Sequence, residues 1–363
     1  MTLVQNWCKV VVSTGPKQQI LQKVLNCFGL LCYNVHNYGY KLVRKHEYNL
    51  LQGEQTMSVL ICDADGELWF TRQEELGLDY ISMPYSIDGN IYYYDLGKNT
   101  DLKKFYDDMR NGSAPTTMAL NPAEYVDILE KYFSQGQDLL YVSFSHKMSG
   151  TFNQLQTALN ELKDKYPERK CVVFDTNAIS LGAGIQMEYA AMLRNAGASD
   201  EEILAKLAEF THKVAMYFIV DDLVYLKRGG RLSAFAAFAG NLLGLKPILT
   251  TDEEGGLNAI EKIVGKRKAI KRIAEKVVET LTDTSMPVYI LDADAPADGE
   301  MLANLIAEKR LDAKIVRQMV GPVIGAHCGP GTVGAIFVAN ERPIPLAKKI
   351  TIFGESLAKA ISL

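Results

Sequence analysis

The sequence lacks the residue patterns that mark several classes of binding site. It has no Cys-x-x-Cys pair and no His-Glu-x-x-His segment, and its five histidines are dispersed, so we expect no metal site. No Gly-Lys-Ser or Gly-Lys-Thr follows a glycine-rich loop, which excludes a P-loop for nucleotides. No apolar run approaches the length of about 18 residues that a membrane-spanning helix needs.

An excess of positive charge is absent as well. The net charge of −4 argues against a general nucleic-acid-binding protein, which would normally be basic. The six cysteines show no pairing pattern and fit thiols in a reducing compartment. The segment nearest to a signal-peptide core, Val24 to Tyr33, is interrupted by Asn26 and Gly29. We therefore expect a cytoplasmic protein without stable membrane insertion.

The length and composition fit a globular protein of more than one domain. A chain of 363 residues is too long for one compact core, and 48% apolar with 23% charged residues is ordinary. Residues 1–56 are rich in Asn, Gln, Tyr and Lys, and we predict that they form an N-terminal extension. The alternative is a helical hairpin packed on the body. We predict one lobe over 57–214 and a second over 215–363.

Short apolar runs that end in small polar or acidic residues recur along the chain. Runs of this kind suit strands buried on both faces. They are Val59–Cys62, Leu139–Val142, Cys171–Phe174, Tyr217–Val220 and Val288–Leu291. Helical patterns lie between them, at Gln154–Lys165, Ala269–Leu281, Gly299–Lys309 and after the capping box that Ser199 and Glu202 would form. This alternation predicts an α/β fold of two lobes with mainly parallel sheets and a ligand near the carboxyl ends of the strands.

An Arg-Gly-Gly-Arg turn, Arg228 to Arg231, follows one of these runs. Two guanidinium groups flank a backbone that is too flexible to be chosen for a helix or a strand. Arginine holds carboxylates and phosphates through paired hydrogen bonds, so the turn predicts an anion site.

A glycine-rich stretch, Gly321 to Gly334, contains a G-x-G-x-x-G match at Gly329, Gly331 and Gly334. A dinucleotide site needs a helix after that turn, but a predicted strand follows here. Two interpretations remain: a tight glycine loop that presents His327 beside an anion, or a structural turn with an incidental histidine.

The segment Ser143 to Thr151 places four hydroxyl groups and His146 after a predicted strand. A nucleophile elbow would need glycine where Lys147 stands, so we do not expect a serine hydrolase. Hydroxyls and amides at a helix start would cap the helix and favour a carboxylate.

Three other features have structural interpretations. The strand-end acids Asp63/Asp65 and Asp292/Asp294 are expected to cap helices. The apolar segment Ala234–Leu245 is a core helix or the wall of an apolar site. The basic residues between Lys262 and Arg272 form a solvated helix face or a protein-docking patch.

Together these motifs resemble those of the DegV family of bacterial fatty-acid-binding proteins. The resemblance covers about Met57 to Val338, and residues 1–56 lie outside it. It rests on an ordered set of segments: Asp63-Ala64-Asp65, the Thr117 loop, Ser145 to Phe152, Val220 to Arg231, Lys246-Pro247-Ile248, and Gly321 to Gly334.

The resemblance implies a fatty acid in a tunnel between the lobes, with its carboxylate held by Thr117 and Ser149. It implies that Arg228 or Arg231, together with His327, serves transfer of the carboxylate to a partner kinase. That partner resembles dihydroxyacetone kinase and makes an acyl phosphate for phospholipid synthesis. Supporting loop residues would be Ser145, Gly150, Thr151, Gly229, Gly230, Gly329 and Gly331. No independent catalysis, cofactor or nucleic-acid partner is expected.

Two positions depart from the family pattern. Met118-Ala119-Leu120 stands where Ser-Gln-Pro usually follows the threonine, and His146 stands where a second serine is common. Two alternative functions stay open at this point. One is a small-molecule phosphotransferase that uses the glycine loop and the arginines, and the other is a lipid-sensing regulatory module.

Overall fold

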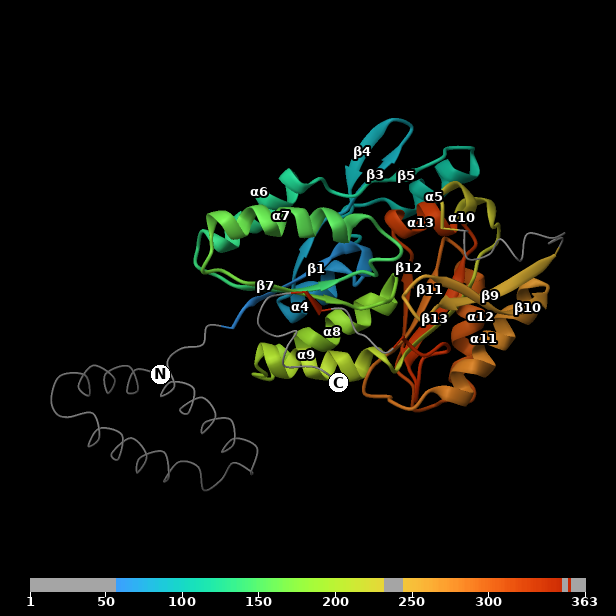
Figure 1. The fold of residues 1–363 in the computed structure, drawn as a ribbon. Coiled ribbons are helices and arrows are strands. Elements are labelled where there is room, and N and C mark those ends of the chain that lie inside the picture. Colours follow the sequence, from blue (N-terminus) through green and yellow to red (C-terminus); the bar gives the residue numbers. More distant parts are fainter. Residues whose placement is uncertain (1–56, 232–243, 348–351, 354–363) are drawn as a thin grey trace, which may run out of the picture. The chain divides into compact units, whose positions relative to one another are not determined.

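The computed structural model describes residues 57–231, 244–347 and 352–353 (Figure 1). The predicted extension, residues 1–56, lies outside the described residues, as does 234–243 of the apolar segment. Within the described ranges, no helix is long and apolar enough to cross a bilayer.

The first sheet confirms the prediction of parallel strands. Its four longer strands are parallel neighbours, and only the short last strand pairs antiparallel. The order is β14 (Ile352–Phe353), β7 (Cys171–Asp175), β6 (Leu139–Ser143), β1 (Val59–Asp63) and β2 (Asp79–Ile81). Strand β6 is buried throughout, as its continuous apolar run predicts.

The second sheet differs from that prediction, because it is mainly antiparallel. Its order is β10 (Leu257–Val264), β9 (Leu245–Thr251), β8 (Val214–Ile219), β13 (Val333–Val338), β11 (Val288–Asp292) and β12 (Ile315–Met319). Of these described strands, only β11 and β12 pair in parallel. Buried apolar runs indicate burial on both faces but not strand direction. The turn between β9 and β10 is too short for the crossover that a parallel pair requires. The division into lobes at residue 214 stays a prediction.

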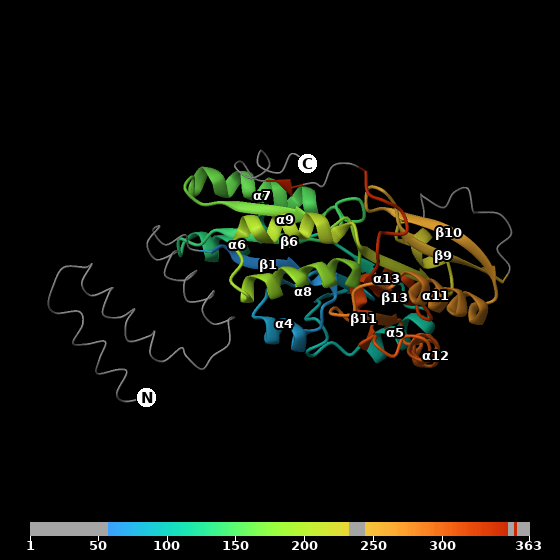
Figure 2. The ribbon, with the colours of Figure 1, turned by 90° about the horizontal axis from the view of Figure 1, so that it is seen from below.

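Helices cover both sheets. On the first sheet, α6 (Pro122–Phe133) and α7 (Thr151–Lys165) lie on one face, and α4 (Phe70–Leu76), α8 (Leu181–Asn195) and α9 (Asp200–Thr211) on the other (Figures 1 and 2). On the second sheet, α11 (Lys266–Thr280) and α12 (Pro296–Ala307) pack against one face. The predicted capping box of Ser199 and Glu202 is present at the start of α9.

Helix α8 packs against both sheets and is buried over most of its length. At Gly184 the helix approaches the carbonyl of Gly66 so closely that a Cβ would overlap it. Further along α8, the buried Glu188 carboxylate pairs with Arg72 at 2.7 Å and accepts a hydrogen bond from the Tyr289 hydroxyl at 2.6 Å. The helix thereby joins α4 and the turn after β1 to β11.

A third group of short elements lies at one end of both sheets. It contains a three-stranded sheet in the order β4 (Asn90–Tyr93), β3 (Pro84–Ile87) and β5 (Thr116–Thr117). The helices α5 (Leu102–Arg110), α10 (Val224–Arg228) and α13 (Pro322–Cys328) belong to the same group, and α13 contacts β3, β5, α5 and α10. These contacts bring segments that are far apart in the sequence to one place.

Candidate functional site

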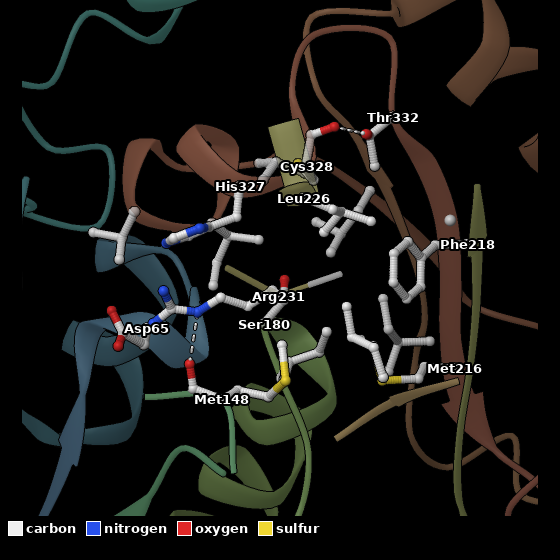
Figure 3. Close-up of a pocket in the computed structure, with 18 of the residues that line it drawn as sticks. Asp65, Met148, Ser180, Met216, Phe218, Leu226, Arg231, His327, Cys328 and Thr332 are labelled. Carbon is white, nitrogen blue, oxygen red and sulfur yellow. Dashed lines mark hydrogen bonds between the residues drawn. The ribbon is translucent and has the colours of Figure 1, made fainter. Parts of the chain in front are cut away.

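A cavity lies between the two sheets (Figure 3). Its empty space is about 840 Å³, part of which is open to solvent. Most of its lining is apolar: Phe144, Met148, Ile179, Met216, Phe218, Leu226, Leu257, Leu291, Val320, Val323, Ile324 and Ile336. Its polar side chains are Asp65, Thr117, Ser149, Ser180, Arg231, His327 and Thr332, with Tyr217 and Cys328 beside them.

Thr117 and His327 meet in this lining. Strand β5 carries Thr117, α13 carries His327, and the Thr117 Oγ1 atom lies 2.8 Å from the His327 Nε2 atom. Burial, with the nearby charge of Arg231, lowers the pKa of His327 to about 4. The imidazole is therefore neutral at pH 7. If its Nε2–H donates to Thr117, the threonine O–H is free to donate to a ligand.

His327 does not lie in a glycine loop, as the sequence predicted, but on the last turn of a helix. The run Pro322 to Cys328 forms α13, with proline in the first turn, where it costs no hydrogen bond. The glycine turn follows it, with positive φ at Gly329 and Gly331, and leads into β13. The strand expected after the turn is thus confirmed.

Ser149 lies just before α7 and lines the cavity. Its Oγ accepts a hydrogen bond from the Thr151 N–H at 3.2 Å and donates to Thr151 Oγ1 at 2.8 Å. Gly150 occupies the N-cap position of the helix. These contacts place the serine hydroxyl at the helix N-terminus, where a negative charge is stabilised.

Ser145 and His146 belong to the same segment but do not line the cavity. The buried Ser145 hydroxyl donates to the Gly255 carbonyl at 2.9 Å, which joins the first sheet to the β9–β10 turn. His146 Nδ1 contacts the buried carboxylate of Asp175. His146, which stands where a second serine is common in the family, therefore lies outside the cavity lining.

The two arginines of the Arg-Gly-Gly-Arg turn have different places. Arg228 is exposed, and its guanidinium lies over the Tyr225 ring at 5.8 Å from the ring centre. Arg231 lines the cavity and is partly buried, with its Nε donating to the Met148 carbonyl at 3.1 Å. Sequence reasoning left open which arginine faces the site, and the structure places Arg231 there.

The two glycines of this turn have separate structural reasons. A Cβ on Gly229 would overlap the ring of His327, so only glycine lets the turn pack against that histidine. Gly230 has a φ of +72°, in the left-handed region that glycine favours.

Asp65 is a cavity residue that sequence reasoning missed, because the strand-end acids were expected to cap helices. Asp292 accepts the Ala295 N–H at 2.9 Å ahead of α12, but it does not cap the helix, whose N-cap is Ala295. Asp63 instead accepts from the Tyr141 hydroxyl and from the Phe144 N–H, the latter at 2.7 Å. Asp65 lines the cavity. The available signal was the alternation of acids at 63, 65 and 67 at the carboxyl end of a buried strand.

In the described ranges, no group of three His, Cys, Asp or Glu side chains could hold a metal ion. The polar part of the cavity lining consists of hydroxyl groups, the His327 imidazole, the Asp65 carboxyl group and the partly buried Arg231 guanidinium.

Comparison with known proteins identifies the family. The model of the DegV family of uncharacterised proteins matches residues 59–340. A DegV domain-containing protein of Clostridium perfringens is 33% identical over 285 residues, which is 78% of this chain and 98% of that protein.

Two solved structures have the same fold. A fatty-acid-binding DegV family protein from Thermus thermophilus aligns with a TM-score of 0.70 at 28% identity, covering 78% of this chain and 100% of that one. A fatty-acid-binding DegV family protein from Streptococcus agalactiae aligns with a TM-score of 0.69 at 30% identity, covering 78% and 99%. The chain belongs to the DegV family.

Proposed function

We propose that this protein binds one long-chain fatty acid and presents its carboxylate to a partner kinase for acyl-phosphate formation. The observation that carries the proposal is the cavity, which combines a continuous apolar wall with Thr117, Ser149, Arg231 and His327. Solved relatives described as fatty-acid-binding proteins support the ligand class.

The energetics favour an acyl chain as the ligand. Burial of about 15 methylene groups contributes on the order of 12 kcal/mol, at roughly 0.8 kcal/mol each. Association and ordering cost several kcal/mol of this. The head group therefore needs only orientation, and two hydroxyl donors supply about 1 kcal/mol each.

Thr117 and Ser149 are the proposed carboxylate ligands. The Thr117 hydroxyl can accept from His327 while donating to the ligand. The Ser149 hydroxyl, at the start of α7, donates to Thr151 Oγ1 in this structure and would turn from it to donate to the ligand. Arg231 supplies a cation near the head group, where the larger charge of an acyl phosphate would be better balanced than that of the acid.

Catalysis is assigned to the separate kinase, because this chain has no P-loop. In that reaction a carboxylate oxygen of the fatty acid would attack the terminal phosphorus of ATP, forming the acyl phosphate and releasing ADP. The exposed Arg228 and the partly buried Arg231 are the residues proposed to face this partner.

Native mass spectrometry of the recombinant protein tests lipid binding directly. We expect a co-purified acyl chain, or uptake of palmitate or oleate by delipidated protein at a ratio of one per chain. Protein that is free of lipid and takes up neither acid would remove the proposal.

Delivery to the kinase needs a second experiment. With a dihydroxyacetone-kinase-like partner and ATP, the loaded protein should yield acyl phosphate, and Arg231→Ala should lower the yield without losing the lipid. Lipid binding without acyl-phosphate formation would favour a lipid sensor, and ATP turnover by the isolated chain would favour a phosphotransferase.

A further inference from the structure

Asp65 is a buried acid that lines the cavity without a hydrogen-bond partner for one of its oxygens. It lies in a 3-10 turn, η2 (Ala64–Gly66), directly after β1, and only 5% of the residue is exposed. Its Oδ1 atom is buried and unpaired. A buried polar atom without a partner is costly, so it points to a group that the ligand supplies.

The two neighbouring acids show what a satisfied carboxylate in this loop looks like. Asp63 accepts hydrogen bonds from Tyr141 and Phe144. Glu67 accepts the Gly321 N–H at 2.5 Å and the hydroxyl of Ser180. Neither lines the cavity. Of the three acids in the loop, the one that faces the cavity is thus the one with an unpaired oxygen.

The cation beside Asp65 does not satisfy it. Arg231 lies next to the carboxyl group in Figure 3, yet Asp65 Oδ1 has no hydrogen-bond partner. The Arg231 guanidinium donates instead to the backbone carbonyls of Met148 and Gly229. Met148 directly precedes Ser149. Asp65 and Arg231 therefore lie at the same end of the cavity as Ser149, one of the two residues proposed to bind the fatty-acid carboxylate.

Burial, reinforced by the charges of Asp63 and Glu67, raises the pKa of Asp65 well above its ordinary value. A protonated carboxyl group has an O–H to donate, and a fatty-acid carboxylate is a strong acceptor for it. An ionised Asp65 would instead repel the ligand.

We propose that Asp65 is a third head-group residue, which donates its proton as a hydrogen bond to the carboxylate of the bound fatty acid. This inference rests on the proposed fatty-acid binding and adds to it. The acid and the carboxylate share one proton, so the site recognises an ionised fatty acid through a neutral donor. Binding then requires that Asp65 be protonated in the free protein, and affinity falls as pH rises.

Other titratable or charged groups face Asp65, and each needs separating from it. From its own loop come Asp63 and Glu67, from α6 Tyr125, from the turn after α10 Arg231, and from α13 His327. Burial raises the pKa of Glu67 to about 8, which lies inside the pH range of 6.5 to 9.5 over which binding would be measured. Asp63 and His327 titrate lower, at about 6 and about 4. Glu67 is therefore the group that the control must neutralise.

The test is a titration of the delipidated full chain with dodecanoate and, in parallel, with uncharged 1-dodecanol across that pH range. For the wild-type protein, dodecanoate affinity should fall by about tenfold per pH unit above the pKa of free Asp65, while dodecanol affinity stays constant. Asp65→Asn keeps a donor that cannot ionise, so it should bind dodecanoate within about threefold of wild type at pH 6.5 and lose the pH dependence.

Two more variants complete the design. Asp65→Leu removes the donor and should weaken dodecanoate by about tenfold or more at pH 6.5 without weakening dodecanol. Glu67→Gln is the matched control: it neutralises the neighbouring acid outside the cavity and should keep the wild-type slope.

Three outcomes overturn the inference while leaving lipid binding intact. They are a dodecanoate pH slope that persists in Asp65→Asn, an unchanged dodecanoate affinity in Asp65→Leu at pH 6.5, and a slope that disappears in Glu67→Gln. Wild-type protein that binds neither ligand removes the proposed function itself and the inference with it.

Discussion

The loops of the first sheet bring both polar and apolar side chains to the cavity, whereas the second sheet brings mainly apolar ones. Loops at the carboxyl ends of the parallel strands β1 and β6 supply Asp65 and Ser149. The mainly antiparallel second sheet supplies apolar side chains from β8, β11 and β13, such as Met216, Leu291 and Ile336. Parallel strands gather polar loop residues at one edge, whereas an antiparallel sheet presents a continuous face. Under the proposed function, we predict that the loops of the first sheet orient the ligand and that the second sheet provides most of the binding energy.

A charge on the apolar wall should break this division most severely. Phe218→Asp places a carboxylate on β8 facing the cavity (Figure 3), and fatty-acid affinity should fall by about a hundredfold or more. Calorimetric titration with palmitate measures it. Phe218→Leu is the control and should bind within a few-fold of wild type. Near-normal binding by the aspartate variant would contradict the role given to the second sheet.

The hydrogen bond between Glu67, which follows β1, and Gly321, at the start of α13, should depend on pH. Burial raises the pKa of Glu67 from 4.5 to about 8. Its stabilising contribution is therefore fully present below pH 4.5 and is lost as pH rises towards 8, because the unfolded chain releases the proton first.

Glu67→Gln removes this titration. Relative to wild type, its free energy of unfolding should rise by about 4 kcal/mol between pH 5 and pH 8.5. Urea denaturation at the two pH values measures the difference. Parallel changes in both proteins would show that Glu67 ionises normally in the fold.

Removal of one head-group hydroxyl should have a smaller effect. Thr117→Val and Ser149→Ala should each weaken palmitate by about fivefold, since a neutral hydrogen bond contributes about 1 kcal/mol. The same titration measures both. A loss as large as that of Phe218→Asp from either variant would mean that the polar residues dominate binding.

The smallest effect is expected at the exposed arginine. Arg228→Ala should leave palmitate affinity within about twofold of wild type, because its side chain lies outside the cavity lining over Tyr225. A lipid-binding defect in this variant would place Arg228 at the head group instead of Arg231.

The strands that the sequence predicted are buried in the fold, whereas others, such as β9, β10 and β12, were not predicted. The five apolar runs correspond to β1, β6, β7, β8 and β11, each with most of its residues buried. Strand direction in the second sheet was wrong, because periodicity carries no information on pairing. Helix α8 was not predicted, since it is buried on nearly all sides and has no amphipathic pattern.

The site was predicted in its residues more than in its geometry. Thr117, Ser149 and His327 were named from motifs, and the structure brings them to one cavity, although their ligand roles stay predictions. The sequence did not decide between Arg228 and Arg231, and it did not place Asp65 in the cavity. Both depend on which way a turn faces. Long-range packing decides that, and local sequence does not record it.

The hydrogen bond between Thr117 and His327 joins positions 210 residues apart. A chain still being synthesised cannot form this contact until residue 327 has emerged, because non-local contacts form only when both segments are available. The polar end of the cavity is therefore complete only after residue 327 has emerged. Under the proposed function, a fluorescent fatty acid would report on a late stage of folding rather than on its beginning.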